Sequence, residues 1–307
     1  MLKVGVIGAG RMGRIRALAA KALGAEVAYI FDQDLSRAEA LARLVNAQTM
    51  ANGNDLCLDE LDALFLCTPP SVRNVGVTAI HADVHLLVEK PLGLRADCGL
   101  KFVEALNHHH VVTAVGYMNR YREGVLQAKA ILETDDALGL TMHWFGGRYG
   151  VSWWSDPDQS GGPINEQCSH LVDLCRYLLG EIETVQALAP NDIRTPETVA
   201  LNLRFASGKL GTLFYSCQSQ EKTIGLTIVT NKRTIQLEGW DFRSPEDIHP
   251  AKDKNAIFTI ETKCFFDAIT GGDEKSVLSD IPDALRTQKT VDAIIQSTIE
   301  GRAIEVI

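Results

Sequence analysis

The sequence predicts an α/β protein whose N-terminal half forms a doubly wound parallel sheet and whose C-terminal half is an α+β domain with a mostly antiparallel, open-faced sheet. Two observations predict it. Short apolar runs alternate with helical patterns up to about residue 118, and strand-like runs joined by short turns fill much of the rest. A chain of 307 residues is long enough for two domains. We therefore expect one domain over residues 1–118 and a second over 119–307, with the last helix able to pack back on the first.

The first half contains five apolar runs of strand length, separated by segments with helical periodicity. Strands are expected at residues 2–7, 26–31, 63–67, 85–88 and 111–115. Helices are expected at residues 12–23, 36–45, 72–81 and 95–106. Ser36, with Glu39 three residues later, is typical of a capping box at the start of a helix.

The second half changes in texture. Helices are expected at residues 123–133, 164–179, 256–269 and 282–300. Strands are expected at residues 140–147, 185–189, 198–205, 210–216, 224–230 and 233–237. Short turns at 206–208 and 231–232 indicate antiparallel neighbours.

Composition and charge exclude several classes of protein. A formal net charge of -9 argues against a nucleic-acid binder, which needs clustered cations. The first strand begins beside Met1, which leaves no room for a signal peptide, and no apolar run approaches the ~18 residues of a membrane helix. The seven cysteines form no C-x-x-C pair, so we expect a reduced, cytoplasmic protein without membrane contact. We interpret residues 108–110, three histidines, as a polar turn, and we expect no metal site.

A glycine-rich turn follows the first expected strand and opens a helix. Its pattern is G-x-G-x-x-G, which in a βαβ unit is the Rossmann dinucleotide fingerprint. Asp32 ends the next strand at close to the ~20-residue spacing of an acid that binds a ribose 2′-hydroxyl, and it favours NAD. Arg11 or Arg37 could instead bind a 2′-phosphate, so NADP stays open as an alternative cofactor. The residues expected to hold the cofactor here are Gly8, Gly10, Arg11, Met12, Gly13, Asp32 and Arg37.

Lys90 follows another expected strand, within Glu89-Lys90-Pro91. Ligands of doubly wound sheets bind at the carboxyl ends of strands, so Lys90 is expected to point toward the cofactor crevice. A lysine partly desolvated there can act as a general acid or base. The alternative is an exposed strand-end lysine paired with Glu89.

The helix expected after Gly161-Gly162-Pro163 carries a polar stripe. At ~100° per residue, four polar side chains share one face: Glu166, His170, Asp173 and Tyr177. Glu166 and His170 are an i, i+4 pair, so the carboxylate can orient the imidazole. The alternative is an ordinary solvated helix face. Nearby Trp153 and Trp154 favour a site, because sugar rings stack on aromatic side chains.

The glycine turn, the Glu-Lys-Pro segment and the Gly-Gly…His helix occur together in this chain. With them the sequence resembles the glucose-fructose oxidoreductase / inositol 2-dehydrogenase / rhizopine-catabolism (Gfo/Idh/MocA) family of NAD(P)-dependent dehydrogenases. The resemblance runs from about residue 1 to 215. Residues 116–121 resemble the segment in which the family's chain leaves the nucleotide domain.

The resemblance implies roles for individual residues. Lys90 would contact the substrate hydroxyl and the nicotinamide ribose, and His170 would be the acid/base or its positioning partner. The remaining implied or inferred contacts are Thr68, Pro69, Glu89 and Lys90 for the cofactor, and Arg120, Trp153, Trp154, Asn165 and His170 for the substrate. Two departures stand out. Glu166 replaces the family's frequent Asp, and residues 71–73 (Ser-Val-Arg) replace a segment that often carries a His.

The expected function is hydride transfer between a nicotinamide and a carbinol carbon of a sugar, polyol or cyclic alcohol. Lys90 and His170 would handle the hydroxyl proton, and Glu166 would tune them. Oxidation of a trans-dihydrodiol and reduction of an imine or C=C bond stay open as alternatives, as does a non-catalytic NAD(P) sensor. The family's open-faced sheet implies a homodimer or homotetramer.

Overall fold

The computed structural model describes residues 1–50, 57–190, 195–246 and 253–307. The chain divides into two units. The first unit comprises Met1–Gly93, Asp97–Met118 and Asn255–Ala284, and the second comprises Leu94–Ala96, Asn119–Lys254 and Leu285–Ile307. The predicted fold class is confirmed: one sheet is parallel, and the other is mostly antiparallel.

The first unit is built on a six-stranded parallel sheet with strand order β3-β2-β1-β4-β5-β6. Its strands are β1 (Lys3–Ile7), β2 (Glu26–Phe31), β3 (Gln48–Thr49), β4 (Ala63–Leu66), β5 (His85–Val88) and β6 (Thr113–Val115). Its helices are α1 (Arg11–Ala22), α2 (Leu35–Val45), α3 (Asn74–His81), α4 (Ala96–Leu106) and α8 (Ala256–Ile269). The strand order reverses beside β1, which is the point where open α/β sheets bind ligands.

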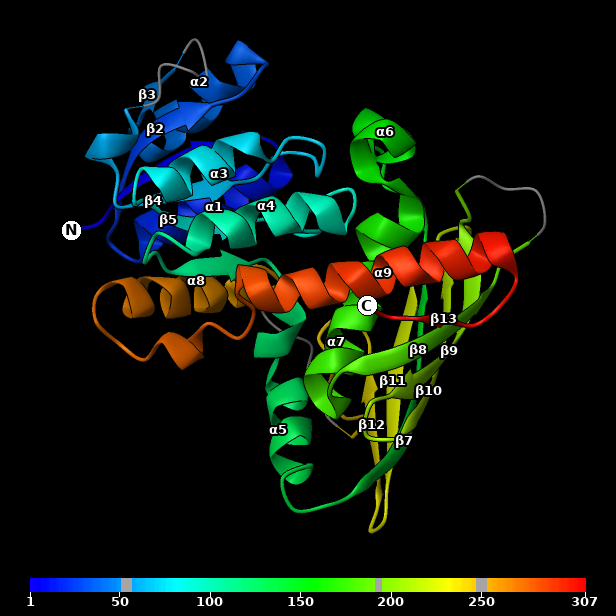
Figure 1. Ribbon diagram of the computed structural model, residues 1–307. Coiled ribbons are helices and arrows are strands. Elements are labelled where there is room, and N and C mark those ends of the chain that lie inside the picture. The colour runs from blue at the N-terminus through cyan, green and yellow to red at the C-terminus, as the bar shows by residue number, and fades with distance from the viewer. Residues whose placement is uncertain (51–56, 191–194, 247–252) are drawn as a thin grey trace. The chain divides into compact units, whose positions relative to one another are not determined.

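Alternate residues of the buried strands face helices on opposite sides of this sheet. Phe65 and Leu87 pack with α1, α2 and α8, whereas Leu66 and Leu86 lie against the α3 and α4 side, where Gly76 meets Phe102 (Figure 1). Because both faces are covered, the strands are apolar throughout, as their sequences indicate.

The second unit is built on a seven-stranded sheet with strand order β12-β11-β7-β10-β9-β8-β13. Its strands are β7 (Ala137–Phe145), β8 (Ile182–Leu188), β9 (Thr198–Phe205), β10 (Leu210–Ser216), β11 (Thr223–Thr230), β12 (Thr234–Glu238) and β13 (Ile304–Glu305). Its helices are α5 (Glu123–Ile131), α6 (Pro157–Ser160), α7 (Ser169–Leu179) and most of α9 (Ile281–Glu300). Neighbouring strands run antiparallel except β7 and β10, which are parallel.

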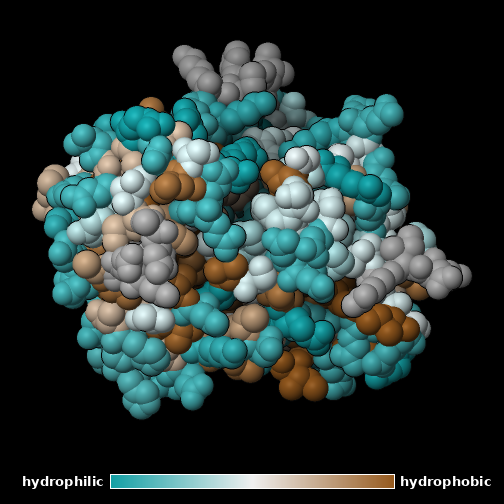
Figure 2. All heavy atoms as spheres, turned by 90° about the horizontal axis from the view of Figure 1, so that it is seen from above, coloured by the Kyte–Doolittle hydropathy of each residue, from teal (hydrophilic) through white to brown (hydrophobic). Residues whose placement is uncertain are grey.

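One face of this second sheet is covered by α7 and α9, as Figure 1 shows. Inward residues of each strand, such as Met142 and Leu201, join Leu171 and Ile294 in one core. The outward residues alternate with them and are exposed or half-buried, which leaves the other face of the sheet open. In Figure 2, which shows one side of the molecule, hydrophilic residues prevail and hydrophobic ones form small separate groups.

Two local expectations need correction. Helix α2 begins at Leu35 rather than Ser36, because the Asp34 carboxylate accepts hydrogen bonds from the backbone N–H groups of Ser36 and Arg37 and is the N-cap. The single helix expected over 164–179 is α7 preceded by a π-helical turn, Ile164–Cys168. Of the helices in the described part of the chain, none has the length and hydropathy needed to cross a bilayer.

Candidate active site

The turn between β1 and α1 contains glycines that the backbone requires. Gly8 has φ +93°, and a Cβ there would lie 2.6 Å from the carbonyl oxygen of Cys67. A Cβ on Gly13 would lie 1.7 Å from the Gly8 oxygen, so α1 packs directly on the turn. A Cβ on Gly10 would meet no atom within 4 Å. The space beside Gly10 therefore suits the close approach of a pyrophosphate to the backbone.

Asp32 lies against this turn. One carboxylate oxygen accepts the N–H of Ala9 at 2.7 Å, and the other accepts the N–H of Asp34 at 2.8 Å. Arg37 is exposed and pairs with Asp34 at 3.1 Å. The hydrogen bond from the Ser36 hydroxyl, together with the Arg37 N–H and charge, lowers the pKa of Asp34. A ribose hydroxyl fits beside such a fixed carboxylate, whereas a 2′-phosphate would be repelled by it.

Lys90 is half-buried and stands two residues after the end of β5, as its position in the sequence predicts. The loop after β4 contains the half-buried Thr68 and Pro69, and β4 and β5 are neighbours in the sheet. Both loops lie at the carboxyl ends of their strands, which is where a parallel sheet presents ligand-binding residues.

Glu89 is buried, so it does not form the exposed ion pair with Lys90 that is the alternative expectation. Its carboxylate accepts from Arg16 of α1 at 2.7 Å, and Arg16 also pairs with Glu261 of α8. Burial of Arg16 works against its charge, but the two carboxylates outweigh that effect and raise its pKa. The Glu89 carboxylate therefore neutralises a buried arginine inside the first unit.

The π-helical turn buries Asn165, one of the predicted substrate residues, in the second unit. Gly161 ends α6 with φ +74°, and a Cβ there would meet Asn165 at 2.5 Å. The Asn165 amide donates to the carbonyl oxygen of Ser160 at 2.8 Å and accepts from Gln288 of α9 at 2.8 Å. Asn165 thereby joins α6 to α9.

Glu166 and the two tryptophans lie close in sequence but differ in exposure. The Glu166 carboxylate accepts from the indole N–H of Trp154 at 3.2 Å. Trp154 is only 1% exposed, so its ring is covered by protein, whereas Trp153 is half-buried at the edge of the core. Trp153 thus retains a ring surface that Trp154 lacks.

His170 is 6% exposed and stacks on Trp144 of β7, with ring centroids 5.9 Å apart and an interplanar angle of 5°. The indole Nε1 of Trp144 is buried and has no hydrogen-bond partner among the described residues. Trp144 was not among the predicted site residues, because on an alternating strand it cannot be told from core residues such as Met142. The ring that stacks on His170 therefore carries a buried hydrogen-bond donor, its indole N–H.

The polar stripe of α7 is buried, not solvated. Asp173 forms a two-pronged ion pair with Arg120, with oxygen–nitrogen distances of 2.9 and 2.6 Å, and also accepts from Thr287 of α9 at 3.1 Å. The Arg120 guanidinium lies over the ring of Tyr177, whose pKa is raised by burial. Arg120, predicted as a substrate contact, is therefore engaged with Asp173.

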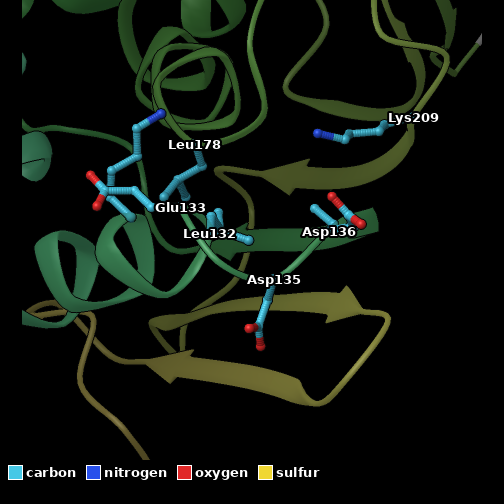
Figure 3. A pocket seen from close by; sticks show the side chains of 8 residues that line it. Leu132, Glu133, Asp135, Asp136, Leu178 and Lys209 are labelled. Atoms are coloured by element: carbon cyan, nitrogen blue, oxygen red, sulfur yellow. The ribbon is translucent and has the colours of Figure 1, made fainter.

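Two pockets of the described surface lie away from the predicted site residues. One of about 150 Å³ opens beside the C-terminal end of α7 (Figure 3). Its lining residues are Lys129, Leu132, Glu133, Asp135, Asp136, Ala137, Leu178 and Lys209. Figure 3 shows Asp135 turned toward the β11–β12 hairpin, where Lys232 and Arg233 pair with it. None of these residues belongs to the predicted site.

Two family models match successive parts of the chain. Residues 2–117 match a model of an oxidoreductase family described as an NAD-binding Rossmann fold, and residues 127–236 match the GFO/IDH/MocA C-terminal domain. Inositol 2-dehydrogenase/D-chiro-inositol 3-dehydrogenase of Shouchella clausii is 35% identical over 235 residues, covering 71% of this chain and 66% of that protein. Inositol 2-dehydrogenase of Salmonella paratyphi B is 26% identical over 232 residues, which cover 71% of this chain and 68% of that protein.

A solved structure has the same architecture along the whole chain. Levoglucosan dehydrogenase in complex with NADH superimposes with a TM-score of 0.88 at 20% identity, covering 100% of this chain and 99% of that one. At this level of identity the likeness supports the fold. The first unit of the chain is an NAD-binding domain, as the glycine turn and Asp32 predict.

Proposed function

The chain belongs to the Gfo/Idh/MocA family of NAD-dependent oxidoreductases, and from that premise we propose that it oxidises a carbinol carbon of a sugar or polyol, or reduces the matching ketone. Two features of the chain carry the proposal: Lys90 stands at a strand end of the NAD-binding unit, and the second unit contains a helix whose buried stripe includes His170. The relatives named as inositol dehydrogenases support the substrate class.

The residues around the glycine turn fit the cofactor. The open space at Gly10, the N-terminus of α1 and the Asp32 carboxylate would hold the pyrophosphate and the adenosine ribose. NAD, when bound, supplies the hydride acceptor. Thr68 and Pro69 would lie along the nicotinamide side.

The protein's own part is to manage the hydroxyl proton. We assign Lys90 and His170 to remove it during oxidation and to return it during reduction. We assign Glu166, whose carboxylate accepts the indole N–H of Trp154, to tune these two residues. Trp153 offers a ring surface for a sugar.

A panel of polyols and sugars, followed by the near-ultraviolet absorbance of NADH, tests this function. The proposal expects NADH to appear with at least one cyclic polyol or pyranose. Binding of NAD in calorimetry without NADH formation for any CH–OH compound would contradict it and favour a non-catalytic NAD sensor. Turnover confined to imines, enones or dihydrodiols would assign a different reaction to the same fold.

We also propose that the open face of the second sheet binds a second copy of the chain. Directly opposed residues on six neighbouring strands form an uncharged row across this face: Gln186, Asn202, Thr212, Thr141, Thr227 and Gln236. Phe145 packs edge-on against the 45% exposed Phe214 and stacks on His143. A neutral row and exposed aromatic side chains, repeated on each copy, suit a two-fold interface.

A further inference from the structure

Arg73 is a buried arginine at the start of α3, and its side chain reaches two loops of the first unit. It is 4% exposed. Its Nη2 donates to the carbonyl oxygens of Glu89 at 3.0 Å and Pro91 at 2.9 Å, and its Nε donates to that of Leu92 at 2.9 Å. Its Nη1 donates to the carbonyl oxygens of Thr68 at 3.1 Å and Pro69 at 3.0 Å.

These acceptors belong to the two loops at the carboxyl ends of β4 and β5. The carbonyl groups of Glu89 and Pro91 stand on either side of Lys90 in the chain, so Arg73 holds the backbone before and after the lysine. The Thr68 and Pro69 carbonyls belong to the neighbouring loop. One side chain therefore joins the loop assigned to the nicotinamide to the loop that carries Lys90.

Only a guanidinium can make this set of contacts. Its N–H groups form a rigid planar fork with five donors, and Arg73 directs them at carbonyl oxygens on both sides. A lysine ammonium has three donors on one atom, and an imidazole has at most two. Either replacement must release several of the carbonyls.

Glu89 is fixed from its other end as well. Its carboxylate is held by Arg16, and a Cβ on Gly116 would lie 2.8 Å from its Oε2, so the side chain is closely packed. Its carbonyl oxygen is held by Arg73. The residue before Lys90 is thus anchored by two arginines, whereas Pro91 and Leu92 are joined to the β4 loop through Arg73.

We infer that Arg73 is a positioning residue that sets the direction of the Lys90 side chain by fixing the backbone on both sides of it. The inference rests on the proposed function, in which Lys90 handles the substrate proton. Small displacements of a catalytic group lower turnover sharply, by as much as about 10²-fold for a shift near 1 Å.

A double-mutant cycle tests the inference. Wild type, Arg73→Lys, Lys90→Met and the double variant are compared for kcat, for KM of the alcohol and for NAD affinity by calorimetry. Arg73→Lys is expected to lower kcat by about 10- to 100-fold in the wild-type background and to have almost no effect in the Lys90→Met background. NAD affinity should change less than about threefold. Val72→Ala, in the same loop but with an exposed side chain, is the control and should match wild type.

Three results would overturn the inference, and they differ from one another. Equal losses from Arg73→Lys in both backgrounds would show that Arg73 acts independently of Lys90. Unchanged kcat in a folded Arg73→Lys protein would show that Lys90 does not need it. Full turnover by Lys90→Met would overturn the proposed role of Lys90 and this inference together. Arg73→His serves as a second variant if Arg73→Lys does not fold, and the same cycle applies to it.

Discussion

At the scale of a single residue, we expect Asp32 to select NAD over NADP. Its carboxylate is fixed by two backbone N–H groups at the end of β2, so it cannot turn away from a 2′-phosphate without losing both bonds. Replacing Asp32 with Ala should raise kcat/KM for NADP relative to NAD by about tenfold or more, since ~1.4 kcal/mol of repulsion corresponds to a factor of ten.

Steady-state kinetics with the two cofactors measures this ratio. Glu39→Gln is the matched control, because it removes one exposed acid from α2 and leaves Asp32 untouched. A ratio that is the same in wild type and Asp32→Ala would mean that Asp32 does not select against the phosphate.

Residues with a chemical motif were predictable, and residues defined by their contacts were not. The positions of the glycine turn, Asp32 and Lys90 near strand ends were predictable because their spacing relative to the strands is fixed by the fold. Arg73 could not, because its importance lies in carbonyl groups up to 19 residues away along the chain. Trp144 was hidden among the alternating apolar residues of its strand.

At the scale of the element, the helix after Gly161 shows what periodicity can and cannot predict. A regular 100° repeat placed Glu166 and His170 on one face, but Ile164–Cys168 is a π-helical turn, so the two residues are not one α-helical repeat apart. The burial of the stripe could not be predicted from the sequence either, because acids and a histidine are also typical of a solvated helix face. Thr287, one of the partners of the buried Asp173, comes from a helix over a hundred residues later.

We expect the stability of the first unit to depend on pH through His85 of β5. The His85 ring accepts the backbone N–H of Val112 at 2.9 Å through Nδ1, which requires that nitrogen to be unprotonated. Burial lowers the pKa of His85, with Asp62 and Glu274 partly opposing the shift. The unfolded chain therefore takes up this proton first, and the stability due to His85 is complete above about pH 6.5 and declines as the pH falls below that value.

Thermal unfolding between about pH 7 and 5 checks this expectation. His85→Gln, whose amide oxygen can accept the same N–H, should lose less of its melting temperature on acidification than wild type does. Parallel pH profiles for the two proteins would show that His85 does not control the effect.

At the scale of the whole molecule, the order of elements carried most of the fold. Alternating runs predicted the parallel sheet, and short turns predicted antiparallel strands, both of which are confirmed. The parallel pairing of β7 with β10 joins residues about 70 positions apart, and nothing local in the sequence indicates it. The two-residue strands β3 and β13 were too short to be predicted.

The open sheet face gives a test of self-association. Phe214→Lys places a charge in the aromatic cluster of that face on each copy. The two like charges would be buried at the interface, so the variant should be a monomer. Sedimentation velocity measures the change. Leu126→Lys, at an exposed position of α5, is the control and should leave the assembly intact. A wild-type protein that sediments as a monomer at micromolar concentration would contradict the proposed interface.

The most direct test of the central claim is the turnover of Lys90→Met measured beside its affinity for NAD. The account predicts that NAD binds with nearly wild-type affinity, since the glycine turn and Asp32 are unchanged, while kcat falls by about 10²–10⁴-fold, the range for a lost general acid–base group. Turnover of Lys90→Met equal to that of wild type would contradict it.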